Sequence, residues 1–273
     1  MPDTFPQIEI GEVIDNDRLR EVFKCSTQGG MRRSNKTNTL VLVSNHVKSV
    51  YGDRWIENTL HYTGMGLVGD QELNGVQNKT LNESNTNGVG VHLFEVFVNK
   101  EYTYQGQVRL TGSPYQERQP DSEGDIRDVW VFPLKLIDGM PLVQNNDDFR
   151  ATQGAKAKRA KRLSESELED KASNAPKTPG SRTTKSTQYE RDPHVAEFSR
   201  RRANGICDLC DCPAPFQKKN GDPYLESHHI VWLSRGGEDT PSNTVALCPN
   251  CHRRMHIVKS ATDTKKLTDK VSH

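Results

Sequence analysis

Short apolar runs separated by polar turns dominate the first half of the chain and predict β-strands. Apolar or alternating runs of this kind cover residues 39–43, 89–98, 102–110 and 128–136. Gly- and Asn-rich segments separate them, and residues 17–23 fit a short helix. The pattern predicts a mainly β domain over residues 1–145.

The pattern changes near residue 146. Residues 155–162 read AKAKRAKR, and a Ser/Glu-rich stretch and a Ser/Thr/Pro/Gly/Lys-rich tract follow. Because so few apolar residues cannot bury a core, residues 146–189 are predicted to be a polar, basic linker, which could carry one polar helix. The basic run has two interpretations, a solvated linker or a contact to a DNA backbone.

Residues 190–273 are predicted to form a small second domain held by metal. Two Cys-x-x-Cys pairs, Cys207/Cys210 and Cys248/Cys251, fit a tetrahedral structural site of four thiolates for Zn²⁺. A domain of this size commonly needs such a metal to supplement a thin core. The alternative is two disulfides, which a reducing compartment disfavours.

Composition limits the class of protein. The 273 residues suggest two domains, and a hydrophobic content of 33% suits two modest cores. The net charge is only +1, so any nucleic-acid contact must come from local basic patches. No signal peptide and no apolar membrane span is recognisable, so we expect a cytoplasmic protein. Of the remaining cysteines, Cys25 is expected to be a small buried side chain, while Cys212 could replace Cys210 as a ligand.

Histidines lie between and after the cysteine pairs. His228 and His229 are adjacent in a strand-like run that leads into a Gly-rich loop. Pro249 fits the first turn of a helix that carries His252 and His256, which are four apart and share one face.

The ordered set His228-His229, Asn243, His252 and His256, framed by the cysteine pairs, resembles the HNH (ββα-metal) nucleases, most closely the McrA type. The resemblance implies that His229 is the general base and that Asn243 pins the loop that orients it. It implies that His228 and His252 bind a catalytic divalent ion and that His256 is a further ligand or a phosphate contact. A histidine of ordinary pKa ~6.5 can accept a proton near neutral pH. Imidazole ligands extend the candidate ions from Mg²⁺ to Mn²⁺, Co²⁺ or Ni²⁺.

Short motifs in the β domain occur in an order that resembles the SRA (YDG) domain, over residues 8–138. The motifs are Gly29-Gly30, Tyr62-Thr63-Gly64, Asp70-Gln71, 78–81, Tyr104-Gln105-Gly106 and 129–131. Members of that family bind DNA that carries 5-methylcytosine or a related base and flip the base into a pocket. The chain departs from the pattern in reading Tyr-Gln-Gly for Tyr-Asp-Gly, and in the aromatic residue before Asp53, which is one position out of place.

A pocket for a flipped base needs an aromatic surface and polar groups that read the Watson–Crick edge. Tyr51 and Tyr62 are the candidate stacking residues, and Asp53 could accept the cytosine amine. The backbone of Thr63 and Gly64 would complete the edge contacts and leave room for a 5-substituent. The basic residues expected to contact phosphates, or to fill the vacated stack, are Arg32, Arg33 and Lys36.

The sequence therefore predicts an α+β protein, with an SRA-like, β-barrel-like N-terminal domain and a small zinc-stapled ββα-metal (HNH) C-terminal domain. The predicted function is a type IV-like restriction endonuclease that recognises 5-methylcytosine or 5-hydroxymethylcytosine in double-stranded DNA and hydrolyses nearby phosphodiester bonds. One alternative is a reader of modified DNA whose zinc module is not catalytic, its histidines being extra zinc ligands or surface residues. The other is an HNH endonuclease indifferent to modification. Cutting both strands needs two active sites or one that acts twice, so a homodimer is expected.

Overall fold

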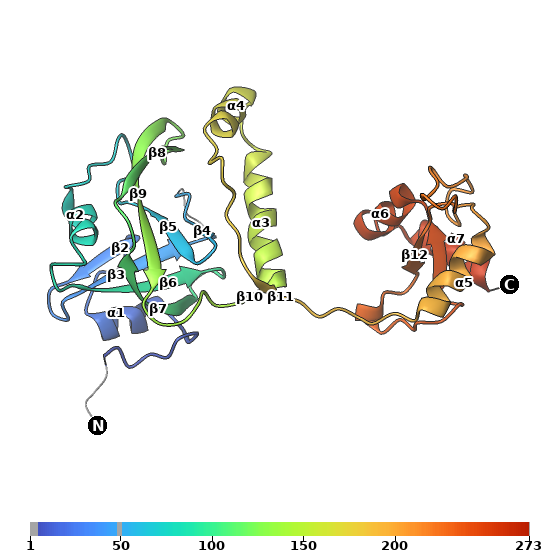
Figure 1. Ribbon diagram of the computed structural model, residues 1–273, viewed down its shortest axis with the longest axis horizontal. Coiled ribbons are helices and arrows are strands. Elements are labelled where there is room, and N and C mark those ends of the chain that lie inside the picture. Colours follow the sequence, from blue (N-terminus) through green and yellow to red (C-terminus); the bar gives the residue numbers. More distant parts are fainter. Residues whose placement is uncertain (1–4, 48–50, 273) are drawn as a thin grey trace. The chain divides into compact units, whose positions relative to one another are not determined.

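The structure is a computed structural model that describes residues 5–47 and 51–272 (Figure 1). The chain divides into two compact units, residues 1–186 and 187–273. Across the described residues, no helix combines the length and the apolar character needed to cross a membrane.

The first unit is built on one mixed sheet. Its strands are β1 (Val13–Ile14), β2 (Met31–Ser34), β3 (Thr39–Asn45), β4 (Arg54–Ile56), β5 (Thr59–Thr63), β6 (Gly90–Val96), β7 (Tyr102–Leu110), β8 (Tyr115–Pro120) and β9 (Ile126–Leu136). Its first two helices are α1 (Asn16–Phe23) and α2 (Val76–Asn82). The four apolar or alternating runs of the sequence correspond to β3, β6, β7 and β9, and the short predicted helix corresponds to α1, so these predictions are confirmed.

The strand order is β2-β3-β6-β7-β9-β5-β4, with β1 paired to β7 and β8 paired to β9. Strands β3 and β6 run parallel, and the other pairs of this sheet are antiparallel. Within the described residues no pairing joins β2 to β4. The mixed, sheet-dominated unit agrees with the predicted SRA-like fold class.

Strand β3 shows why the sequence reads as a continuous apolar run. Leu40 and Leu42 belong to one buried cluster, whereas Val41 belongs to a second cluster with Leu19 and Phe23 of α1. Successive side chains of a strand point to opposite faces. Both faces of β3 are therefore covered, and neither face needs polar residues.

The segment that was predicted as a linker belongs to the first unit as far as Ser186. It contains α3 (Asn146–Ala160) and α4 (Glu165–Ser173), and its short strand β11 (Thr184–Lys185) pairs in parallel with β10 (Gln144–Asn145). Helix α4 begins with a capping box formed by Ser164 and Glu167. Polar helix caps and strand pairing order this segment. These contacts could not be predicted from its composition, which shows only that apolar residues are few.

The second unit contains the ββα arrangement. Its elements are α5 (Pro193–Ala203), β12 (Glu226–His229), the 3₁₀ turn η1 (Leu233–Arg235), β13 (Thr244–Leu247), α6 (Pro249–Ile257) and α7 (Ala261–Val271). Strands β12 and β13 pair antiparallel, with His228 opposite Val245. Pro249 occupies the first turn of α6, as predicted. A small core that includes Leu247, Met255 and Leu267 joins the hairpin to α6 and α7.

Candidate functional site

The four predicted cysteine ligands lie together in the second unit. Their sulfur atoms are all within 4.8 Å of one another. The separation of 4.0 Å between the sulfurs of Cys210 and Cys248 is about twice an S–S bond, so this pair is not a disulfide. Three of the four side chains are buried, and the set of four thiols fits a structural Zn²⁺ ion. Cys212 is exposed and its thiol contacts the carbonyl of Cys210, outside this cluster.

Three histidines form a second cluster. His228 comes from β12, and His252 and His256 come from α6. One ring nitrogen of each lies within 4.8 Å of the others. Nε2 of His228 is buried and has no hydrogen-bond partner among the described residues. Because a buried polar atom is rarely left unpaired, this nitrogen points to a ligand, and the three imidazoles fit a divalent ion.

The surroundings of His228 and His252 favour metal binding in two ways. Burial, assisted by the neighbouring His252 and His256, lowers the pKa of His228 to about 3. The ring is therefore neutral at pH 7 and retains the lone pair that a metal ligand needs. The carboxylate of Glu226 on β12 is paired with Nδ1 of His252, which leaves Nε2 of that ring facing the cluster.

His229 lies beside the cluster and is paired with an acid. Nε2 of His229 is 2.7 Å from Oδ1 of Asp239. Oδ2 of Asp239 accepts the backbone N–H of Asp192 at 2.6 Å. This N–H and His229 together lower the pKa of Asp239, so it is ionised and can hold the imidazole in one orientation. Sequence reasoning missed Asp239, and its only signal was an acidic residue in the loop between the two strands.

Asn243 closes that loop. Its Oδ1 accepts the N–H of Val231 at 2.9 Å, and its Nδ2 donates to the carbonyls of Val231 at 2.9 Å and Glu238 at 2.7 Å. These bonds tie the end of β12 to the start of β13, next to both His229 and Asp239.

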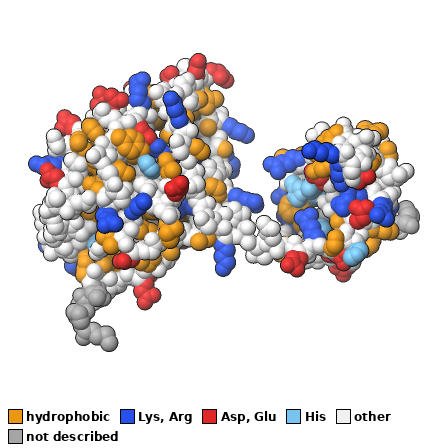
Figure 2. Space-filling view, in the orientation of Figure 1, with side chains coloured by type: hydrophobic (Ala, Val, Ile, Leu, Met, Phe, Trp, Pro, Cys, Tyr) orange, Lys and Arg blue, Asp and Glu red, His pale blue; other side chains and the backbone are white. Residues whose placement is uncertain are grey.

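A cavity of about 420 Å³ opens onto His229 and the three-histidine cluster. It is lined by Thr187, Gln188, Tyr189, Arg191, His228, His229, Trp232, Leu233, Ser234, His252 and His256. Figure 2 shows histidine side chains beside Lys and Arg on the visible face of the second unit. A cationic, histidine-lined hollow suits an anionic substrate such as a phosphodiester.

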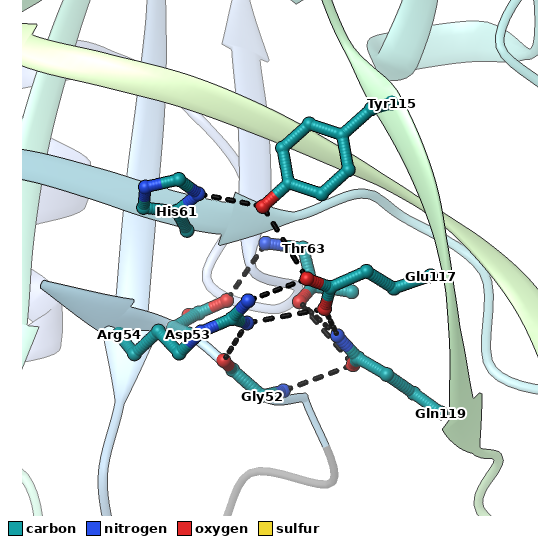
Figure 3. Close-up of polar contacts among 8 residues, drawn as sticks. All are labelled: Gly52, Asp53, Arg54, His61, Thr63, Tyr115, Glu117 and Gln119. Carbon is teal, nitrogen blue, oxygen red and sulfur yellow. Dashed lines mark hydrogen bonds and ion pairs between the residues drawn. The ribbon is translucent and has the colours of Figure 1, made fainter. Parts of the chain in front are cut away.

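The first unit contains a polar constellation around Asp53 (Figure 3). Oδ1 of Asp53 accepts the backbone N–H of Thr63 at 2.9 Å, and Oδ2 accepts the hydroxyl of Ser44 at 2.8 Å. Burial is the main cause that raises the pKa of Asp53. Gln119 of β8 completes the group, because its amide oxygen accepts the N–H of Gly52 at 3.1 Å and its nitrogen contacts Oγ1 of Thr63 at 3.2 Å. Sequence reasoning did not identify Ser44 or Gln119 as members of this group.

A second layer supports this group. Glu117 accepts a hydrogen bond from Gln119 at 3.3 Å and forms a two-point ion pair with Arg54. Tyr115 joins the same carboxylate at 3.3 Å and contacts Nδ1 of His61 at 2.6 Å (Figure 3). Strands β4, β5 and β8 therefore hold the residues around Asp53 through side chains as well as backbone pairing.

Two predicted contact residues are placed differently from the expectation. Tyr62 is only 3% exposed, its ring packs in the main core and its hydroxyl donates to the carbonyl of Gly30, so it presents no free stacking face. The guanidinium of Arg32 is also buried, and it donates to Gly29 and Asn16 rather than facing a phosphate. In both cases the strand turns the side chain inward, which a motif cannot reveal.

The other residues predicted to contact the base or the DNA backbone include Tyr51, Gly64, Arg33 and Lys36. Tyr51 is half-buried, and its hydroxyl donates to the carbonyl of Gly66 at 3.0 Å. The N–H of Gly64 donates a hydrogen bond to the carbonyl of Trp130, so it is not free to bind a base edge. Arg33 binds its own turn through Asn38 at 2.7 Å, and Lys36 is exposed.

A ββα hairpin–helix with a histidine cluster and four clustered cysteines, in one chain with a sheet domain that holds a polar cluster around Asp53, defines an SRA–HNH protein. The chain belongs to the family described as "ScoMcrA-like, SRA domain", whose model matches residues 10–151. The family model of the HNH endonucleases matches residues 207–257.

Among curated proteins, the chain is 51% identical over 75 residues to the type IV methyl-directed restriction enzyme EcoKMcrA of Escherichia coli (strain K12). The match covers 28% of this chain and 27% of that protein, so the chain spans about a quarter of the length of the curated relative. Among solved structures, the type IV phosphorothioation-dependent restriction endonuclease ScoMcrA is 20% identical, with a TM-score of 0.42, over 97% of this chain and 63% of that one. The modification-dependent TagI restriction endonuclease is 18% identical, with a TM-score of 0.39, over 92% and 79% of the two chains.

Proposed function

We propose that this protein is an endonuclease that cuts double-stranded DNA near a modified cytosine, 5-methylcytosine or 5-hydroxymethylcytosine. The observation that carries the proposal is the His229–Asp239 pair beside a three-histidine cluster in one hollow. A structural zinc module does not need an acid–histidine pair next to a nitrogen that lacks a partner. The match to the HNH endonuclease model supports the same class of reaction.

In this mechanism His229 is the general base. Asp239 occupies Nε2, so Nδ1 of His229 accepts the proton of the attacking water, and the aspartate stabilises the resulting imidazolium. His228, His252 and His256 would hold a divalent ion, which when bound neutralises charge on the scissile phosphate. Arg191 lines the same hollow and would add a positive charge for the DNA backbone. Asn243 fixes the loop that carries Asp239.

The four-cysteine cluster would hold a structural Zn²⁺ ion. Cys207 and Cys210 follow α5, while Cys248 caps α6 and Cys251 lies within it. The ion would therefore join α5 to α6, the helix that carries His252 and His256. Its role is to stabilise the fold, since thiolates fill all four positions and leave none for substrate.

The polar cluster around Asp53 would bind the flipped base. Its carboxylate can accept the cytosine amine, because each oxygen accepts one hydrogen bond and keeps a free lone pair. Flipping costs a few kcal/mol, which the pocket contacts must offset. Tyr51 remains the candidate stacking residue, since Tyr62 is turned into the core. We further propose that the protein acts in the cytoplasm, where its DNA substrate lies, and that it cuts as a homodimer.

The decisive experiment compares cleavage of methylated and unmethylated copies of one plasmid, with Mg²⁺, with Mn²⁺ and with a chelator. We expect cutting of the methylated copy only, and none with the chelator. Equal cutting of both copies would eliminate modified-base recognition.

A second experiment tests the nuclease assignment. His229→Ala should reduce cleavage ~10²–10⁴-fold, the usual contribution of a positioned general base, and leave binding to the methylated duplex intact. The matched control is His194→Ala, which removes an exposed histidine of the same unit. A His229→Ala protein that cuts like its parent would refute the mechanism.

A further inference from the structure

Residues 180–182, which lie shortly before the second unit, make buried contacts with the rest of the first unit. The guanidinium of Arg182 donates to both carboxylate oxygens of Glu95, at 3.0 and 2.5 Å. The side chain of Glu95 is 0% exposed and that of Arg182 is 9% exposed. A buried, two-point ion pair of this geometry is far more specific than a surface contact.

The backbone on either side of this pair is also held. The N–H of Ser181 donates to the carbonyl of Trp55, on the edge strand β4, at 2.7 Å. A side chain at Gly180 would come within 2.9 Å of Cβ of Arg54, so only glycine allows this approach. The guanidinium of Arg182 also lies over the ring of Phe97, 4.8 Å from its centre. The segment is therefore built into the first unit at residues 180–182.

The anchor point is connected to Asp53 by a chain of hydrogen bonds. Glu95 accepts a hydrogen bond from His46 at 2.8 Å, His46 contacts Ser44 at 3.4 Å, and Ser44 donates to Asp53 at 2.8 Å. Burial alone would raise the pKa of Glu95, but the bond from His46 and the charge of Arg182 lower it to about 2. Arg182 is thus attached to the same wall that carries the carboxylate proposed to read the base.

We propose that the Arg182–Glu95 pair is an anchor that fixes the length of the tether between the base pocket and the nuclease unit, and thereby the distance from the modified base to the cut. The inference rests on the proposed function and makes Arg182 a positioning residue. Seven Cα–Cα steps lead from Lys185, the end of β11, to Asp192, the cap of α5, and an extended chain of that length spans at most ~25 Å.

Without the anchor, the tether would begin at the end of α4. Eighteen Cα–Cα steps lead from its cap, Asn174, to Asp192, and they reach ~60 Å when the chain is extended. The other attachments are few: β11 pairs with β10 over two residue pairs, and Ser181 and Thr183 each add one backbone hydrogen bond, so we expect the segment to detach without the ion pair. The added reach of ~35 Å corresponds to about ten base pairs at ~3.4 Å each.

The test uses the full chain and a long duplex with one 5-methylcytosine at a defined position, whose cut ends are mapped on both strands. We expect the parent to cut within a narrow window. Arg182→Ala should spread the cuts outward by up to ~10 base pairs, and a gel shift measures its affinity for the duplex separately. Arg182→Lys, which keeps the charge without the two-point contact, should give an intermediate spread. Lys185→Ala, a neighbouring cation that is exposed, is the matched control and should cut like the parent.

A second pair of variants avoids an unpaired buried charge. Gly180→Val should displace the segment without changing Glu95, and a six-residue Gly/Ser insertion after Ser186 should lengthen the tether with the anchor intact. Both should widen the window. If Arg182→Ala and Gly180→Val fold, bind and keep the parent's cut positions, the anchor is refuted.

A measurement without DNA separates this inference from the proposed function. Small-angle X-ray scattering should show a larger maximum dimension for Arg182→Ala than for the parent and for Lys185→Ala. Equal dimensions would overturn the anchor whether or not the protein cuts DNA. Failure of the parent to cut methylated DNA, with the dimensions still different, would overturn the proposed function alone.

Discussion

The pairing of His229 with Asp239 gives a graded prediction for catalysis. The two side chains are 2.7 Å apart, and His229 is buried while Asp239 is about a quarter exposed. Asp239→Ala removes a hydrogen bond to an ionised group, which contributes ~1.5–3 kcal/mol. If that free energy is used to stabilise the imidazolium in the transition state, the cleavage rate falls ~10- to 150-fold.

Asp239→Asn should have a smaller effect. The amide keeps the size and one acceptor oxygen but loses the charge, so the difference between a charged and a neutral hydrogen bond, ~1–1.5 kcal/mol, is lost. This corresponds to a ~5- to 13-fold slower reaction. Glu238→Ala, which removes an exposed carboxylate one residue away, is the control and should leave the rate unchanged.

The assay is single-turnover cleavage of a methylated duplex, with affinity measured separately by gel shift. The expected order of rates is parent and Glu238→Ala, then Asp239→Asn, then Asp239→Ala, at constant affinity. The reasoning fails if Asp239→Ala cuts within twofold of the parent. It also fails if the loss of rate is matched by an equal loss of binding, because Asp239 would then act on DNA and not on His229.

Three further predictions concern stability. Cys248→Ser should abolish the unfolding transition of the second unit in a thermal scan, because structural zinc contributes folding free energy. The first unit should still bind DNA. A normal transition of the second unit would argue against zinc binding. The pKa of Glu95 falls from 4.5 to about 2 on folding, so the parent should lose stability as the pH drops from 4.5 towards 2. Glu95→Gln should lose less stability over that window. Parallel curves of melting temperature against pH for the two proteins would contradict this. Gly64→Ala should destabilise the first unit by ~1–3 kcal/mol in urea unfolding, because the new Cβ would lie 2.8 Å from Gln71 and 2.9 Å from Asn78; unchanged stability would show that both amides can move.

Local pattern predicted much of the fold. The β3 and β7 runs, the α1 helix and the turn at Pro249 each depend on residues close in sequence, and each is found where the pattern placed it. The four-cysteine cluster was also predictable, because its members lie in two Cys-x-x-Cys motifs, whereas the grouping of His228 with His252 and His256 came from the resemblance to the HNH nucleases.

The parts that sequence could not supply depend on contacts between distant residues. Glu95 and Arg182 are 87 positions apart, and neither residue carries a motif. Asp239 was missed because a single loop carboxylate has no distinguishing neighbour. Tyr62 and Arg32 were misplaced because a motif gives order along the chain but not the face of the strand on which each side chain falls.

The sulfur of Cys248 has two structural roles. Its sulfur belongs to the four-cysteine cluster and also accepts the N–H of Cys251 at the start of α6, the helix that carries His252 and His256. Oxidation of this one thiol would release the start of the helix and, with it, two of the three imidazoles. Under the proposed function, peroxide or a thiol-modifying reagent would then stop cleavage and leave the first unit able to bind DNA.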